Sequence, residues 1–288
     1  MSLEKSLVVM FAAGLLSSAR AQTTTATILG VVEGLTEYLP VSSTGHLILV
    51  GEWLGAGGEG AKSFEIVIQL GAILAVMVHY RALLAERAIG LARGQKASID
   101  LFTALAVGFV PTAIAGLLLR KTVKRLLFGP GPVAVALLVG GVAMIAIERY
   151  RVYRDLHGLD GLEHVTPRRA LAIGLGQCVS IWPGSSRSMC TIVAGQLVGL
   201  STATAAEFSF LLALPTLGAA TLYELWKGRH ELLAEGQSTE LAIGMVISFF
   251  VAWGVVAVFL RYLRRRGLEP FGYYRIVVGA AVLWVTLR

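Results

Sequence analysis

Six predominantly apolar runs, each close to the length of a bilayer-crossing helix, dominate this sequence. They cover 64–80, 101–119, 132–147, 208–225, 241–262 and 271–287. A membrane-spanning helix needs about 20 mostly apolar residues. Only 15% of the residues are charged, whereas about 25% is usual for a soluble domain. The sequence therefore predicts an all-α integral membrane protein, and it excludes disordered, collagen-like and disulfide-rich secreted classes.

The net charge of +7 is scattered between the apolar runs and forms no continuous basic stripe. We therefore interpret it as loop charge beside anionic lipid and expect no nucleic-acid partner. The two cysteines, Cys178 and Cys190, are too few for a disulfide framework or a zinc site.

Residues 1–21 form a separate segment. Lys5 precedes a short apolar run over 7–16, and Ala19-Arg20-Ala21 follows it, a pattern that resembles a secretory signal peptide. The alternatives are an additional hydrophobic N-terminal helix or a start codon upstream of the one that is used. The functional argument therefore concerns 22–288, predicted to be a single membrane-embedded domain.

Two apolar segments, 27–54 and 170–200, are each interrupted by a polar cluster. The first cluster runs from Pro40 to His46 and the second from Pro183 to Ser188. Non-helical backbone at membrane depth is tolerated only where protein buries it or where it lines a wet cavity. Each segment is therefore predicted to be two short half-helices that meet at a re-entrant loop.

The two interrupted segments also resemble each other. With Pro40 placed on Pro183, an offset of 143, Ser42 and Ser43 fall on Ser185 and Ser186. The similarity predicts an internal repeat over about 24–80 and 170–225. Paired interrupted segments in two halves indicate a binding site at the repeat interface. The alternative is chance similarity among apolar helices.

Basic residues in the linkers predict the orientation, because cytoplasmic loops carry an excess of Lys and Arg. Alternating spans place the linkers 81–100, 149–169 and 261–266 on one side, with thirteen basic residues. The linkers on the opposite side contain seven, of which four lie between 120 and 125. The first side is predicted to be cytoplasmic.

Glu33 and Glu37 lie four residues apart in an apolar helix, so their carboxylates share one face. Charges in a membrane span are rare and usually functional. Such a pair suits binding of a divalent metal, orientation of a histidine or proton relay. The structural alternative is a pair that only lines a wet cavity.

His46 lies three residues after Ser43, close enough in a tight loop for a hydrogen bond. A serine beside a histidine that a carboxylate supports is the arrangement of an activated nucleophile. Glu37 is the natural third member. The alternative is that His46 is a structural residue with no role in chemistry.

Arg187 lies among the serines of the second cluster. Arginine forms planar, bidentate pairs with phosphate oxygens, and amides after Gly184 could open a half-helix whose N-terminus binds anions. The alternative is an arginine that only neutralises Glu33 or Glu37.

Together these groups predict a wet pocket that hydrolyses an anionic ester or anhydride, with phosphate favoured by the arginine. No Walker loop, GxSxG elbow or HExxH motif occurs. A transporter or flippase with the same inverted-repeat architecture is the main alternative, and a non-catalytic lipid-binding scaffold is another.

These motifs resemble the undecaprenyl-diphosphate phosphatase family of the bacitracin-resistance type. The matching segments are 29–46, 64–71, 182–188 and 207–213, within a resemblance that covers about 24–288. Residues 1–21 depart from the family. The sequence lacks the signature of the type 2 phosphatidic acid phosphatase superfamily. That signature is a longer pattern of lysine or arginine, then serine-glycine-histidine, then arginine or histidine.

The resemblance implies a polytopic helical fold with two inverted repeats and two re-entrant helix pairs. It also implies hydrolysis of undecaprenyl diphosphate to the monophosphate, which recycles the lipid carrier of peptidoglycan synthesis and confers bacitracin resistance. It further implies Mg²⁺ or Ca²⁺ as cofactor and a homodimer. The location that it implies is the bacterial inner membrane, as a multi-pass protein with its active site facing the periplasm.

The chemistry of the residues that match the family motifs suggests a role for each. Ser43 is expected to attack the terminal phosphorus, with His46 as base and Glu37 orienting it. In the competing mechanism His46 is the nucleophile and Ser43 is only a ligand. Glu33 and Glu37 are expected to hold the metal, and Arg187 and Ser186 the phosphate. The expected substrate-binding residues are Ser42, Thr44, Gly184, Ser185, Ser186, Ser188 and Thr191.

Overall fold

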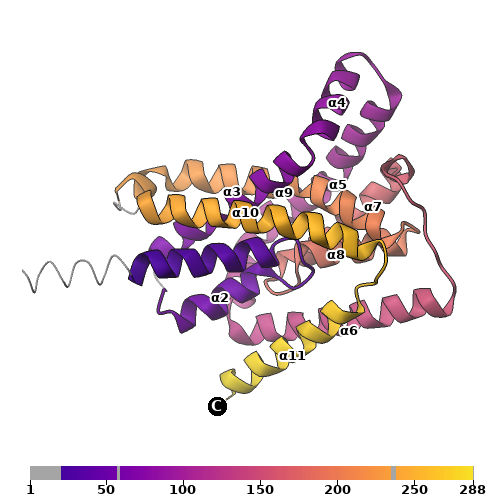
Figure 1. Cartoon of the computed structure of the whole chain (residues 1–288). Helices are drawn as coiled ribbons and strands as arrows, with labels where there is room; N and C mark the ends of the chain where they lie inside the picture. The colour runs from indigo at the N-terminus through magenta and orange to yellow at the C-terminus, as the bar shows by residue number, and fades with distance from the viewer. Residues whose placement is uncertain (1–20, 57–58, 235–237, 288) are drawn as a thin grey trace, which may run out of the picture.

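A computed structural model of the chain describes residues 21–56, 59–234 and 238–287 (Figure 1). Its first helix covers residues 21–36. The others are α2 (Ser43–Trp53), α3 (Glu59–His79), α4 (Arg81–Ala92), α5 (Lys96–Leu126), α6 (Pro130–Tyr153), η1 (Leu162–His164), α7 (Pro167–Gln177), η2 (Cys178–Ile181), α8 (Arg187–Leu197), α9 (Thr202–Ala234), α10 (Ser238–Leu263) and α11 (Glu269–Thr286). The described residues contain no strand beyond one isolated bridge, between Leu159 and Leu200. The signal-like interpretation concerns residues that lie almost entirely outside the described ranges.

All six predicted apolar runs lie in helices. Four described segments are long and apolar enough to cross a bilayer: Lys96–Leu119, Pro130–Tyr153, Thr202–Lys227 and Thr239–Leu263. The pair Phe64–His79 and Arg81–Ala92, bent by 71°, forms a fifth candidate. The prediction of an all-α, multi-pass membrane protein is confirmed.

The internal similarity is visible in the starts of α2 and α8, which are both 11 residues long. Their N-caps, Ser42 and Ser186, have positive φ angles of 75° and 70°. Each serine hydroxyl accepts a hydrogen bond from the amide three residues ahead, of Gly45 and Met189 respectively. The two halves thus begin their second half-helix with the same strained cap.

The equivalent caps are 144 residues apart, so the predicted offset of 143 is wrong by one residue. The second loop has one more residue between its proline and its cap than the first, and alignment on the prolines therefore misplaced the serines. The offset of 144 also matches Phe64 with Phe208. In this register Ser43 corresponds to Arg187, and Glu33 corresponds to Gln177.

Close backbone contacts between glycines hold the helices of the two halves together. A side chain at Gly30 would meet the Gly244 carbonyl oxygen of α10 at 2.6 Å. The equivalent Gly174 of α7 packs in the same way against Gly108 of α5. Small residues allow such close approach of helices in lipid. Elsewhere α3 packs mainly against α10, and α6 against α11.

The three linkers that were predicted to be cytoplasmic lie at one end of the molecule, on the right in Figure 1. At this end Arg149 of the second linker pairs at 2.9 Å with Glu269, the first residue of α11. Arg151 is buried nearby and donates to the carbonyl oxygens of Gln196 and Leu200. The described arrangement therefore gathers the basic linkers on a common side.

Candidate active site

The polar centre of the protein is formed by Glu37, Ser43 and Arg187. The Ser43 hydroxyl donates to Glu37 Oε2 at 2.5 Å. Arg187 Nη2 donates to the other oxygen, Oε1, at 3.0 Å. All three side chains are almost fully buried. The carboxylate of the first loop therefore joins the predicted nucleophile to the predicted phosphate-binding arginine.

Residues of both halves hold the Arg187 guanidinium in place. Its Nη1 donates to both the carbonyl and the hydroxyl oxygen of Ser209 on α9, each at 3.1 Å. The Ser209 hydroxyl also shares a 2.6 Å hydrogen bond with Thr191. On its other side the guanidinium lies 5.4 Å from the centre of the Tyr38 ring, in cation–π range. Nε of Arg187 has no protein partner.

Tyr38 is the structural support beneath this centre. Its ring is completely buried and meets Phe210 edge-on at 5.1 Å. Its hydroxyl donates to the carbonyl oxygen of Ala72 at 2.9 Å. Because its hydroxyl proton is hydrogen-bonded and its ring is packed, Tyr38 presents a rigid face to Arg187.

Glu33 lies one helical turn before Glu37 and is 1% exposed. Its Oε1 has no hydrogen-bond partner. The charges that act on it are those of Glu37, Glu65 and Arg187. Glu33 therefore presents an unpartnered carboxyl oxygen one helical turn from Glu37.

This donor set fits a divalent cation. Carboxylate oxygens are the ligands that Mg²⁺ and Ca²⁺ prefer, and Mg²⁺ is commonly bound by one or two carboxylates with substrate phosphate and water completing its shell. The described residues contain no group of three or more His, Cys, Asp or Glu side chains with metal-binding geometry. Glu33 and Glu37 would therefore supply a partial shell.

The two polar loops contact each other directly. The Ser188 hydroxyl, which also pairs with Ser186 at 3.0 Å, donates to the carbonyl oxygen of Leu39 at 2.8 Å. At the starts of α2 and α8 the first amides have no acceptor within their own helix, and such amides attract anions. Gly184 has a φ of 95°, and a side chain there would meet the Val133 carbonyl oxygen at 2.7 Å. Only glycine fits this position.

The predicted contact between Ser43 and His46 is wrong in this structure. The His46 ring is one turn into α2, and its Nδ1 pairs with the Ser42 carbonyl oxygen at 2.7 Å. Its Nε2 lies 2.7 Å from the Tyr274 hydroxyl of α11. Both oxygens of Glu37 are occupied by Ser43 and Arg187, so Glu37 does not orient His46. The helix direction turns the ring toward α11.

These partners also define the histidine tautomer. A carbonyl oxygen only accepts hydrogen bonds, so Nδ1 carries the proton. In the neutral ring Nε2 then accepts the Tyr274 O–H. The two rings are stacked, with centres 5.7 Å apart and an interplanar angle of 6°. Nε2 is therefore the basic nitrogen of His46.

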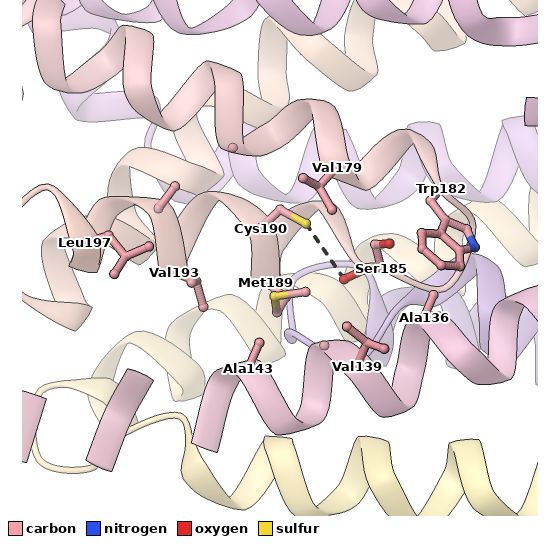
Figure 2. Close-up of a pocket in the computed structure, with 13 residues that line it drawn as sticks. Ala136, Val139, Ala143, Val179, Trp182, Ser185, Met189, Cys190, Val193 and Leu197 are labelled. Atoms are coloured by element: carbon pink, nitrogen blue, oxygen red, sulfur yellow. Dashed lines mark hydrogen bonds between the residues drawn. The ribbon is translucent and has the colours of Figure 1, made fainter. Parts of the chain in front are cut away.

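Two other predicted residues lie outside the polar centre. Thr44 is exposed, and Ser185 faces an apolar cavity of about 250 Å³. Figure 2 shows Ser185 beside Trp182 and Cys190, whose thiol donates to the Ser185 carbonyl oxygen at 3.9 Å. The cavity lies between α6, η2 and α8, and its remaining lining is Ala136, Val139, Gly140, Ala143, Gly176, Val179, Met189, Val193, Ala194 and Leu197.

Sequence reasoning missed three residues that contact the site. Ser209 lies in one of the segments that carry the family resemblance, but its residue type and spacing indicate no role. Tyr274 and Arg275 lie in the run 271–287, which the apolar pattern predicts to be a simple span. A charged residue inside a membrane run is itself a signal of function, and Arg275 carries that signal.

Comparison with known proteins identifies the family. Residues 26–281 match the family model described as bacitracin resistance protein BacA. The chain is 59% identical over 261 residues to an undecaprenyl-diphosphatase of Sorangium cellulosum, covering 90% of this chain and 85% of that protein. It is 47% identical to one of Sphingopyxis alaskensis (91% and 97% covered) and 46% identical to one of Thermoanaerobacter pseudethanolicus (89% and 94%). The chain belongs to the BacA family of bacitracin resistance proteins.

Proposed function

We propose that this protein is an undecaprenyl-diphosphatase, which releases the terminal phosphate of undecaprenyl diphosphate and so recycles the lipid carrier of peptidoglycan synthesis. The main support from the geometry is the buried array in which Glu37 joins Ser43 to Arg187. This array combines a hydroxyl nucleophile, a base and a phosphate-binding cation. The names of the relatives support the choice of substrate.

In the proposed reaction the Ser43 hydroxyl oxygen attacks the terminal phosphorus. Glu37 Oε2, 2.5 Å away, accepts the hydroxyl proton as general base. The bond between the terminal phosphorus and the bridging oxygen breaks, and undecaprenyl monophosphate leaves with that oxygen. Water then hydrolyses the phosphoserine to inorganic phosphate and restores Ser43. Glu37 thus takes the role that the sequence had suggested for His46.

Arg187 stabilises the charge on the phosphoryl oxygens, which is the largest contribution in this type of transfer. The substrate phosphate shares the guanidinium with Glu37, and Nε, which has no protein partner, offers a further donor. The hydroxyl of Ser186 and the first amides of α2 and α8 add neutral donors around the same phosphate.

Glu33 and Glu37 would hold a Mg²⁺ or Ca²⁺ ion. When bound, this ion supplies positive charge that offsets the carboxylates and the substrate phosphates. The unpartnered Oε1 of Glu33 and the carboxylate of Glu37 one helical turn away support this assignment.

His46 has a separate role in this scheme. Its Nε2 is the basic nitrogen and contacts Tyr274, so it can exchange a proton with the departing phosphate or with the attacking water. In the competing scheme Nε2 itself attacks the phosphorus. Trapping the phosphorylated enzyme and mapping the modified residue separates the two schemes, because the first gives phosphoserine at Ser43 and the second phosphohistidine.

The protein is further proposed to act as a homodimer in the bacterial inner membrane, with its active site facing the periplasm. The gathering of basic linkers at one end (Figure 1) supports the orientation. The apolar cavity beside Trp182 and Ser185 (Figure 2) is a suitable place for the first isoprene units of the lipid tail.

The decisive experiment is phosphate release by the purified protein from C55 diphosphate, measured with and without a chelator. Ser43→Ala serves as the matched inactive variant. We expect release that requires Ser43 and stops when divalent ions are removed. Absence of release by the folded wild-type protein with Mg²⁺ and Ca²⁺ present would contradict the proposed function.

A further inference from the structure

We propose that Arg275 is a positioning residue that holds the two active-site loops in fixed register with each other. Its side chain is 0% exposed and reaches from α11 to three backbone carbonyl oxygens. Nη1 donates to Pro40 at 3.1 Å, and Nη2 donates to Gly184 at 2.9 Å and to Ala136 of α6 at 3.0 Å. One guanidinium thus joins the first loop, the second loop and α6.

The two loop carbonyls are equivalent positions of the internal repeat. Pro40 and Gly184 are 144 residues apart, and each lies two residues before the N-cap serine of its half-helix. Arg275 therefore connects the same point of both halves. The offset of 144 places Gly131 opposite Arg275, so the other half supplies no equivalent cation.

The partners of Arg275 suggest a role beyond charge neutralisation. All of its described partners are backbone carbonyls, and no acidic side chain is among them. A buried cation without a counter-ion is costly, and charges in a membrane protein interior usually mark function. Gly140 of α6 leaves the space that the guanidinium occupies, because a side chain at Gly140 would collide with Nη2.

The planar guanidinium sets the distance between the two loops, because its donors have a fixed fork geometry. On the reactive side, the loops meet through Glu37 with Arg187 and through Leu39 with Ser188. Substrate phosphate bound to Arg187 competes with Glu37 for the guanidinium and so weakens the contact between Glu37 and Arg187. The tie through Arg275 does not involve the substrate and persists during turnover.

This role predicts that losing Arg275 lowers kcat more than it raises KM. Arg187 and the lipid tail still bind the substrate in the ground state, whereas transfer needs the hydroxyl, base and cation aligned. A misplacement of about 1 Å far from the chemistry can cost about a hundredfold in rate. The inference rests on the proposed phosphatase activity.

The test compares Arg275→Met and Arg275→Lys with Arg151→Met and Arg151→Lys. Arg151 is a matched control, since it is also a buried arginine that donates only to carbonyl oxygens, those of Gln196 and Leu200. Its contacts lie at the basic end of the molecule, away from the loops. Each variant is purified in the same detergent, and its thermal unfolding, kcat and KM for C55 diphosphate are measured.

We expect about a hundredfold lower kcat for Arg275→Met, with KM within about threefold of wild type. Arg275→Lys should recover part of kcat, because an ammonium can still bond one or two of the carbonyls. The Arg151 variants should unfold at a lower temperature but keep kcat. If Arg275→Met fails to fold, the kcat of Arg275→Lys relative to Arg151→Lys decides the question.

Near wild-type kcat in a folded Arg275 variant would overturn the inference, and so would an equal loss of kcat in the Arg151 variants. Both results presuppose an active wild-type enzyme. If the wild type releases no phosphate, the proposed function fails first, and the two failures are thereby distinguished.

Discussion

The Ser43 hydroxyl lies 2.5 Å from Glu37 Oε2, across the turn that separates the first helix from α2. Ser43 lies six residues after Glu37 in the chain. Its hydrogen bond uses one oxygen of the Glu37 carboxylate and leaves the other oxygen for Arg187. In the proposed reaction this carboxylate is both the base for the hydroxyl and the counter-ion of the cation that binds phosphate.

Replacing Glu37 by glutamine should reduce kcat by about 100- to 10,000-fold, the usual contribution of a general base. The amide keeps the size of the side chain but cannot accept the hydroxyl proton. Turnover at a series of pH values, together with thermal unfolding, tests the change. The exposed carboxylate variant Glu52→Gln is the control, and full activity of Glu37→Gln would exclude Glu37 as base.

Arg187→Lys should lower kcat/KM by about a hundredfold, which corresponds to about 2.7 kcal/mol. An ammonium cannot contact Glu37, Ser209 and a phosphate oxygen with the same planar fork. Arg169→Lys is a suitable control, because Arg169 also donates to backbone carbonyls, those of Val198 and His164, at the opposite end of α8. Wild-type kinetics of Arg187→Lys would disprove the phosphate-binding role.

Tyr274→Phe should lower kcat by about tenfold, because it removes one hydrogen bond of about 1.4 kcal/mol to His46 Nε2 while the stacked ring remains. The pH profile of kcat should change as well, since the partner of the basic nitrogen is lost. Tyr273→Phe is the neighbouring control. Tyr273 bonds only Glu269 and Arg149, so its variant should keep the wild-type profile, and identical profiles for both variants would refute a role for Tyr274.

Filling the apolar cavity should weaken binding of the lipid tail. Ala143→Phe places a ring between α6 and α8 (Figure 2) and should raise KM for C55 diphosphate by about tenfold, or about 1.4 kcal/mol of lost apolar contact. KM for a five-carbon prenyl diphosphate should change less. Val142→Phe is the control on the exposed face of the same helix, and equal KM values in both variants would mean that the tail lies elsewhere.

The fold and the main polar residues could be predicted from the sequence because both depend on local patterns. Apolar runs identify the helices, and the two interrupted segments identify the loops that contain Ser43 and Arg187. The repeat register was off by one residue because the prolines are more conspicuous in the sequence than the N-cap serines. Those serines are equivalent only by their positive φ angles and hydrogen bonds.

The direction of the His46 side chain could not be predicted in this way. Closeness to Ser43 along the chain favoured a contact, but the turn of α2 and the carbonyl of Ser42 direct the ring toward α11. Its partner Tyr274 is 228 residues away. Only tertiary packing of α11 against α6 brings Tyr274 and Arg275 to the loops.

The location of Arg275 in α11, which follows both loops along the chain, has a consequence for biosynthesis. The first loop leaves the ribosome early, the second follows much later, and Arg275, which we propose joins them, is translated after both. The nascent chain therefore contains Ser43, Glu37 and Arg187 long before they are locked together. The proposed role of Arg275 predicts that a chain terminated before α11 inserts its earlier helices yet remains inactive.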